Sequence, residues 1–171
     1  MRGSLYGLFL IPQRHFLTIM HLGNYPGSQF MSAKLNYGIP DIELPLPEGA
    51  TVNPSDFAGH ELVVLFCPLD RVAAAQELAD YSRHADQFSY NDAWMIAVCD
   101  DIKTLPASRV TLADDPDLRA WKAFGESLDP PEQLPRKEGA VFLFGRGGCL
   151  TRAWRGKGHG NEVVSELGRR R

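Results

Sequence analysis

The stretch VVLFCPLDRVAAAQELADY, residues 63–81, decides the fold of this chain. Its first part is a continuous apolar run, which is typical of a strand covered on both faces. Pro68 ends this strand, and Asp70 is placed to cap a helix that begins near Arg71. The unpaired N–H groups at such a helix start attract anions, so α/β proteins often place their chemistry at these corners. The first turn here nevertheless contains alanines and no nucleophile, acid or base.

The composition narrows the class of protein. The chain has 171 residues, 44% of them hydrophobic and 23% charged, which fits one domain of an ordinary globular protein. Its net charge of −3 gives no electrostatic case for binding nucleic acid or an anionic membrane. Three cysteines are too few for a disulfide-stapled secreted scaffold, so we expect a cytoplasmic protein. The sequence has neither a CxxC pair nor histidines at ligand spacing, and we therefore expect no metal and no cofactor.

The first thirty residues differ from the rest of the chain. Their apolar clusters are broken by Pro12, Arg14 and His21 and show no clear period. The longest cluster is too short to span a membrane and lacks the cleavage site of a signal peptide. We therefore divide the chain into an extension over residues 1–30, with little part in the function, and a domain over residues 31–171. A weak export signal is the alternative interpretation of the extension.

Beyond this extension, the sequence predicts alternating strands and helices. Two proline-containing segments, 41–47 and 51–57, indicate a short hairpin or an extended arm at the edge of the fold. Two apolar runs, 61–67 and 93–99, predict buried strands, with one helix over residues 71–88 between them. The face of this helix that we expect to be buried consists of Val72, Ala75, Leu78, Ala79, Ala85 and Phe88.

The second half of the chain predicts a helix, a hairpin and a final helix. Residues 111–125 hold a helix with Pro116 near its first turn and Gly125 at its end. The apolar segments AVFLFG and CLTRAWRG flank a glycine turn and predict a β-hairpin over residues 140–156. A closing helix is expected over residues 160–168. This order predicts an α/β, thioredoxin-like fold with a central mixed sheet flanked by helices.

From about Ile39 to Leu167, the chain resembles the peroxiredoxins, the alkyl hydroperoxide reductase/thiol-specific antioxidant family. The segments that carry the resemblance are, in order, DFAG, VVLFCP, LADDPDLRAWKAFG, AVFLFGRGG and WRGKGHGNEV. The resemblance implies a thioredoxin-like fold that is often a homodimer. It also implies an antioxidant oxidoreductase that reduces peroxides with a cysteine thiolate and depends on a thiol reductant.

The side chains that the family uses for catalysis are missing at the matching positions. The family's pattern is a proline, a threonine four positions later and a cysteine three positions after that. Anchored on Pro68, this pattern places Val72 at the threonine and Ala75 at the peroxidatic cysteine. The family's arginine falls at Gly139, with Arg136 as the nearest candidate. Because alanine supplies no thiolate, the resemblance implies a vestigial pocket at Pro68, Val72, Ala75 and Arg136.

The three cysteines are the remaining candidates for redox chemistry. Cys67 and Cys99 end the two buried strands, and Cys67 is placed to face the vacant pocket as a relocated redox group. Free cysteine is among the most buried residue types, so we expect both to be thiols in the core. A Cys67–Cys99 disulfide remains open, because it requires Cα atoms within about 7 Å of one another. Cys149, beside the hairpin turn, is expected to be the most reactive thiol towards reagents.

Two functional hypotheses follow. The favoured one is a binding or regulatory module without peroxidase activity, which takes a protein partner, a peptide or a small ligand in the old pocket. The alternative is a thiol-dependent oxidoreductase that reduces peroxides through Cys67, with Cys99 as its second thiol. The glycine-rich segment 156–160 lacks the spacing of a phosphate-binding loop and is expected to lead into the last helix.

Overall fold

A six-stranded mixed sheet forms the centre of the protein. The computed structural model describes residues 30–34, 36–105 and 108–170. The sheet has the order β1-β8-β7-β4-β5-β6. These strands are β1 (Phe30–Met31), β4 (Glu61–Phe66), β5 (Ala93–Val98), β6 (Thr111–Ala113), β7 (Ala140–Phe144) and β8 (Leu150–Arg155). Strands β4, β5 and β6 run parallel, whereas β7 is antiparallel to β4 and to β8. The predicted central mixed sheet is therefore confirmed.

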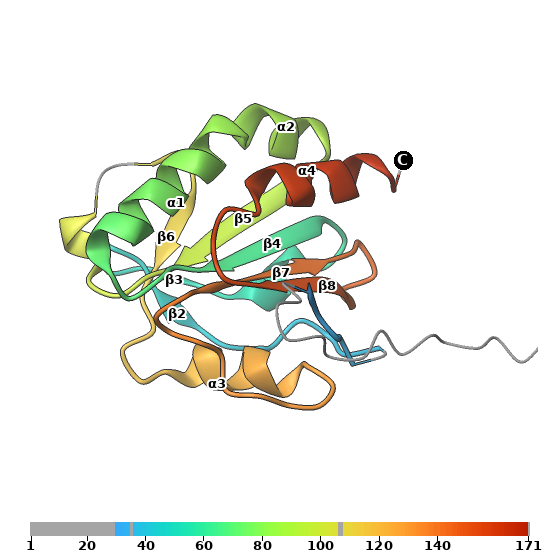
Figure 1. Ribbon diagram of the computed structural model, residues 1–171, viewed down its shortest axis with the longest axis horizontal. Coiled ribbons are helices and arrows are strands. Elements are labelled where there is room, and N and C mark those ends of the chain that lie inside the picture. The colour runs from blue at the N-terminus through green and yellow to red at the C-terminus, as the bar shows by residue number, and fades with distance from the viewer. Residues whose placement is uncertain (1–29, 35, 106–107, 171) are drawn as a thin grey trace, which may run out of the picture.

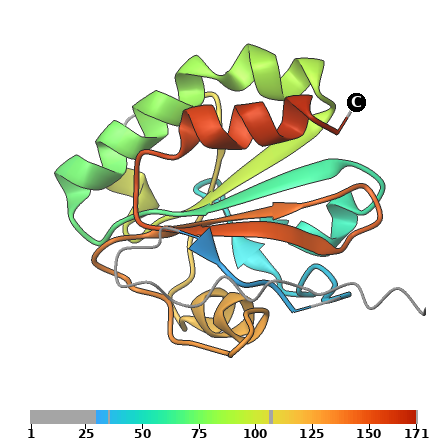
Figure 2. The same cartoon turned by 45° about the vertical axis from the view of Figure 1, so that its right-hand side comes forward.

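The helices form a layer on each face of this sheet. Helices α1 (Arg71–Arg83), α2 (Ala85–Tyr90) and α4 (Gly160–Gly168) cover one face, and α3 (Arg119–Glu126) covers the other (Figures 1 and 2). Short 3₁₀ helices η1 (Pro54–Phe57) and η2 (Ile102–Thr104) lie in connecting segments. In the described part of the chain, no helix is long and apolar enough to cross a membrane.

The predicted edge hairpin is confirmed as a separate small sheet. Strands β2 (Leu44–Pro45) and β3 (Thr51–Val52) pair antiparallel with each other. The predicted extension over residues 1–30 lies, except for Phe30, outside the described residues. The boundary between extension and domain stays a prediction.

The alternation of side chains along β4 separates the core into two clusters. Leu62, Val64 and Phe66 belong to the cluster under α3. Val63 and Leu65, with Cys67 just after the strand, belong to the cluster under α1, α2 and α4. Every residue from 61 to 68 is buried, as expected for a strand covered on both faces. The strand therefore delivers a different set of side chains to each helical layer.

The cluster under α3 is built from aromatic rings. The ring of Phe124 on α3 lies 5.0 Å from that of Phe66, 5.2 Å from that of Phe142 and 5.8 Å from that of Phe144, measured between centroids. All three pairs are edge-to-face, the arrangement that the charge distribution of aromatic rings favours. Packing of this kind fixes the position of α3 on the sheet.

The helix predicted over residues 71–88 is divided at His84 into α1 and α2. The predicted buried face is also wrong for α1, because Val72 is 66% exposed and Ala79 is exposed. The residues of α1 that are buried are Ala73, Ala74, Glu77, Leu78 and Tyr81. A glutamate within this face interrupts the apolar pattern, so the sequence indicated a neighbouring stripe of the helix instead.

Helix α3 begins later than predicted, and the strand β6 before it was not predicted. Residues Thr111–Ala113 pair with Ile96–Val98 as a third parallel strand. Helix α3 begins only at Arg119, after a left-handed residue at Leu118 with φ of 56°. Gly125 lies inside the helix rather than closing it. Its conformation is ordinary, but a Cβ atom there would collide with the backbone carbonyl oxygen of Glu132, so close packing accounts for this glycine.

Candidate functional site

The turn between β4 and α1 is built as the sequence predicted. The Asp70 carboxylate accepts a hydrogen bond from the Ala73 N–H at 2.8 Å and caps α1. The Leu69 N–H donates to the carbonyl oxygen of Arg136 at 2.8 Å, which ties this corner to the segment before β7. Pro68 is buried at the start of the turn. The hydrogen bonds of Ala73 and Leu69 therefore hold the backbone of this corner in place.

Gly139 packs directly beneath this corner. Its φ of +81° is a conformation that residues with a side chain rarely adopt. A Cβ atom at this position would lie 2.6 Å from the carbonyl oxygen of Phe66 and 3.2 Å from Cδ of Pro68. The position that matches the family's arginine therefore has no room for any side chain while the corner keeps its present backbone.

Arg136, the substitute candidate for that arginine, is engaged with other groups. One guanidinium nitrogen donates to the Asp100 carboxylate at 2.5 Å, and the guanidinium lies 5.8 Å from the ring centroid of Trp121. Arg136 lines a cavity of about 280 Å³ at the ends of β5 and β6. The other residues of that cavity are Asp100, Asp101, Asp114, Asp115, Pro116 and Leu118. The cation thus lies among carboxylates.

Ala75 faces a different cavity. It is the fifth residue of α1 and lines a wide apolar depression of about 600 Å³. The other lining residues are Leu78, Ala79, Ser82, Arg83, Ser108 and Arg109. Val72 points to solvent, with 66% of its surface exposed. Pro68 and Gly139 therefore lie together, whereas Ala75 and Arg136 line two different cavities in the described part of the chain. Whether these residues form a vestigial pocket stays a prediction.

Cys67 and Cys99 are joined by a disulfide, so the expectation of two free core thiols is wrong. Their Cα atoms are 5.0 Å apart, within the range that a disulfide requires. Both residues are buried, with exposed fractions of 3% and 1%. The physical reason is the register of the parallel strands, in which Phe66 lies opposite Val98. The residues that follow these two strands must therefore also lie opposite each other.

The disulfide lies in the core cluster beneath α1. Ala74, Leu78 and Ile102 belong to the same buried cluster. Arg71, at the start of α1, donates to the carbonyl oxygen of Thr104 at 2.7 Å and so connects α1 to η2. This cation and Arg136 both have other hydrogen-bond acceptors. Burial of both residues in this cluster limits the access of an external thiol to the sulfur atoms.

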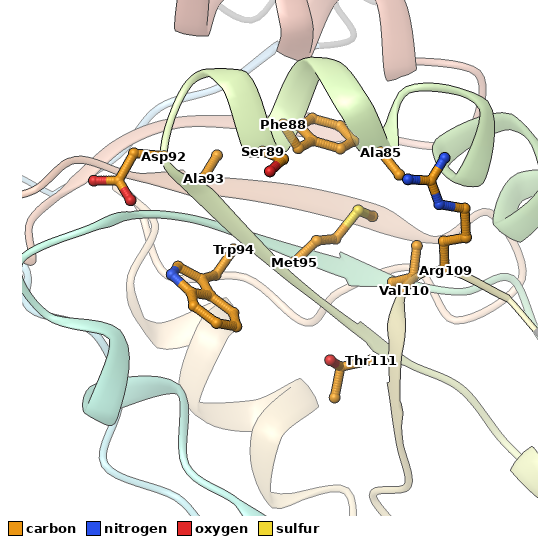
Figure 3. A pocket seen from close by; sticks show the side chains of 10 residues that line it. All are labelled: Ala85, Phe88, Ser89, Asp92, Ala93, Trp94, Met95, Arg109, Val110 and Thr111. Carbon is orange, nitrogen blue, oxygen red and sulfur yellow. The ribbon is translucent and has the colours of Figure 1, made fainter.

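A further cavity, which sequence reasoning missed, lies at the opposite end of β5. It measures about 360 Å³ and lies between α2 and the first residues of β5 (Figure 3). Trp94 is half exposed here and contacts Phe57, while Met95 lies on the other face of the strand in the cluster of Phe88. The strand β6 pairs only with Ile96–Val98, so the start of β5 extends past it. In the sequence Trp94 falls within the apolar run 93–99, so its exposure and this cavity had no signal there.

The charged groups of this further cavity are already paired. Arg109 donates to the Asp86 carboxylate at 2.5 Å, which lowers the pKa of Asp86 and raises that of Arg109. Asp92 lies 3.0 Å from the His60 ring and 3.4 Å from the Arg146 guanidinium. Throughout the described residues, no group of three His, Cys, Asp or Glu side chains is arranged to hold a metal ion. The cavity at this end of β5 thus lacks, among the described residues that line it, an unpaired charged group for catalysis. The corner between β4 and α1, with its disulfide, is the better candidate for a reactive site.

Comparison with known proteins identifies the class of fold. No family model matches the sequence, and no curated protein matches it. Among solved structures, peroxiredoxin Q of Xanthomonas campestris is 23% identical with a TM-score of 0.66, over 78% of this chain and 97% of that one. A PrxQ mutant of Xylella fastidiosa is 24% identical with a TM-score of 0.66, over 84% and 97% of the two chains.

A third structure extends the comparison beyond the peroxiredoxins. A putative thiol:disulfide interchange protein DsbE of Chlorobium tepidum is 18% identical with a TM-score of 0.62, over 80% of this chain and 96% of that one. At these identities the comparisons establish the fold alone. The chain has a thioredoxin-like fold, which confirms the fold predicted from the order of its elements.

Proposed function

We propose that this protein is a peroxiredoxin-like binding or regulatory module without peroxidase activity at the α1 corner. The observation that carries the proposal is the packing of Gly139 against Phe66 and Pro68, which leaves no space for an arginine side chain. Ala75 supplies no nucleophile on α1. Peroxide reduction needs a thiolate and a cation that stabilises it, and this corner offers neither in the required place.

The cavities beside the corner support a binding role. The depression at Ala75 is mainly apolar, whereas the cavity at Arg136 is lined by four aspartates. A protein partner or a peptide with an apolar side chain next to a basic one would match both surfaces. We propose that such a partner is bound, in the cytoplasm, along α1 and across the ends of β5 and β6.

A second candidate function is favoured by the Cys67–Cys99 disulfide. An external dithiol would reduce it by exchange, which yields two thiols on this protein and one disulfide on the donor. A peroxide would then oxidise the Cys67 thiolate to a sulfenic acid. The alkoxide or hydroxide that leaves would take up the proton lost from the Cys67 thiol and depart as an alcohol or as water. Attack by the Cys99 thiolate would restore the disulfide and release hydroxide, which takes up the proton released when the Cys99 thiol ionises. Cytosolic disulfides are usually of this transient kind.

Peroxide consumption in the presence of dithiothreitol separates the two functions. We expect the wild type to consume peroxide no faster than Cys67→Ser, because burial of the disulfide under α1 restricts exchange. Ala75→Cys tests whether the helix start lowers the pKa of a thiol there, and we expect at most weak activity from it because Val72 and Gly139 lack the family's side chains. Turnover by the wild type that is lost in Cys67→Ser would instead establish the thiol oxidoreductase.

A further inference from the structure

The loop between β8 and α4 is fastened to α1 by a buried carboxylate. Glu77 on α1 is only 5% exposed, and its Oε1 atom accepts a hydrogen bond from the Gly158 N–H at 2.6 Å. Gly156 and Gly158 both have φ of +84°, a conformation suited to glycine, so the loop is shaped to present this N–H group. The Oε2 atom of Glu77 is also buried and has no hydrogen-bond partner within the part of the chain that the structure describes. The hydrogen bond from the Gly158 N–H is therefore the one backbone contact that offsets the desolvation of the Glu77 carboxyl group among the described residues.

The next residue of the loop, His159, is buried with both ring nitrogens against oxygen atoms. It is 2% exposed, with Nε2 2.9 Å from the carbonyl oxygen of Arg155 and Nδ1 2.5 Å from Glu162 Oε2. A carbonyl oxygen only accepts, so Nε2 must carry a proton. The contact between Nδ1 and the Glu162 carboxyl group fastens the loop to the first turn of α4.

Charged and titratable groups surround Glu77 from two sides. Burial raises the pKa of Glu77 above its usual value, and the negative charge of Asp80 on α1 adds to this effect. The hydrogen bond from Gly158 and the positive charges of His159 and Lys157 in the loop act in the opposite direction. The effect of burial is larger than these opposing effects, so the pKa of Glu77 is raised overall. In the closed structure Glu77 therefore holds its proton to higher pH than an exposed glutamate does.

Two aromatic residues complete the cluster without supplying a charge. Burial and the neighbouring carboxylates raise the pKa of Tyr81 well above its usual value, so its hydroxyl stays neutral. That hydroxyl and the indole N–H of Trp154 are both buried without a hydrogen-bond partner in the described residues. The Trp154 ring is stacked on His159, with centroids 6.4 Å apart. The site thus contains few groups able to stabilise an ionised Glu77.

We propose that Glu77 forms a proton-operated latch that holds α1 against the loop before α4 and releases it as the pH rises. Loss of a proton from Glu77 leaves a buried charge with a single hydrogen bond, and it therefore weakens the contact between loop and helix.

The pH window follows from the sign of the Glu77 shift. An unfolded or released Glu77 titrates near 4.5, and the closed form titrates above this value. Stability of the closed form is therefore fully present below pH 4.5 and declines as the pH rises through the higher pKa of the closed form. Ala74 and Leu78 on α1 share the core cluster of the disulfide, so release of this helix is a route by which the sulfur atoms become accessible. The latch itself does not depend on whether the disulfide turns over.

Amide hydrogen exchange of Gly158 in the oxidised full chain tests the latch. The opening constant, corrected for the intrinsic pH dependence of exchange, is measured from pH 4.5 to about pH 8. We expect it to rise in the wild type about tenfold for each unit by which the pKa of Glu77 differs between closed and open forms. Glu77→Gln keeps an oxygen that can accept the Gly158 N–H but cannot ionise, so its opening constant should rise less. The exposed Glu138→Gln is the matched control and should follow the wild type.

Two results would overturn the proposal. One is an opening constant of Gly158 that does not change with pH in the wild type. The other is a rise in Glu77→Gln as large as that in the wild type. Carbon-13 titration of the Glu77 carboxyl group in the wild type is a second test that needs no variant, and a midpoint at or below that of free glutamate would also contradict the latch.

Discussion

The two faces of the central sheet are built from different kinds of contact. The face under α3 is packed by aromatic rings, with Phe124 in edge-to-face contact with Phe66, Phe142 and Phe144. The face under α1, α2 and α4 holds the Cys67–Cys99 disulfide and the buried polar cluster of Glu77 and His159. The same strands supply both faces, because successive side chains of a strand point in opposite directions.

This difference indicates that the two faces of the sheet contribute differently to folding and to the response of the protein to pH and to thiols. Ring packing depends on shape and apolar area, and it changes little with pH or redox state. A disulfide and a buried carboxylate respond to thiols and to protons. We therefore expect the α3 face to determine whether the protein folds and the α1 face to determine how the folded protein responds to its surroundings.

The largest effect is expected from Phe124→Ala on the α3 face. Removing a ring that contacts three others leaves a cavity, and the free energy of unfolding should fall by about 3–5 kcal/mol. Urea denaturation measures this loss, and Phe124→Leu should recover part of it because it refills much of the volume. A loss that disappears when the disulfide is reduced would contradict the separation of the two faces.

The next largest effect is expected from removing the disulfide. The bond closes a loop with a sequence separation of 32, so its loss should lower the free energy of unfolding by about 2–4 kcal/mol. The double variant Cys67→Ala, Cys99→Ala and chemical reduction of the wild type should give similar losses. Cys149→Ala is the control, since Cys149 is not bonded. Urea curves of the wild type with and without reductant that coincide would show that the bond contributes nothing.

A smaller effect is expected at the start of α1. Asp70→Ala removes the acceptor for the Ala73 N–H and should cost about 1 kcal/mol. Asp70→Asn retains a capping oxygen and should cost only a fraction of this. Because α1 covers the disulfide, the alanine variant should also be reduced faster by dithiothreitol, measured by thiol labelling. An unchanged rate of reduction would mean that access to the sulfur atoms does not pass through this end of the helix.

The smallest effect is expected from the exposed ion pair of Arg109 and Asp86. Arg109 lowers the pKa of Asp86, so the pair favours folding above the usual pKa of aspartate and loses this contribution as the pH falls. Water and salt screen both groups, and Arg109→Ala should therefore give no measurable change in urea denaturation at neutral pH. A clear loss of stability would indicate that the cavity in Figure 3 is more closely packed than its lining suggests.

Most of the fold followed from simple patterns in the sequence. Continuous apolar runs located β4, β5 and β7, and Asp70 marked the start of α1. The strand β6 was missed because only three residues pair, too few to show a period of their own. The face of α1 was misassigned because Glu77 is buried there, and a pattern of apolar residues cannot anticipate a buried carboxylate.

The candidate site was less predictable because it depends on contacts between distant segments. Cys67 and Cys99 could be placed at the ends of neighbouring strands, but their pairing depends on a register that the sequence does not contain. The contact between Glu77 and Gly158 joins residues 81 positions apart. The separation of Ala75 from Arg136 depends on where the segment before β7 crosses the corner. The sequence shows which side chains are able to react or to ionise, but it does not show the distances between them.

The packing of Gly139 limits which substitutions this corner can accept. A cysteine at position 75 requires a single substitution on α1, but a side chain at position 139 collides with the backbone of β4 and with Pro68. An arginine fits at position 139 only if the corner shifts. A peroxidase site therefore cannot be built at this corner by exchanging side chains alone, because the course of the backbone would also have to change.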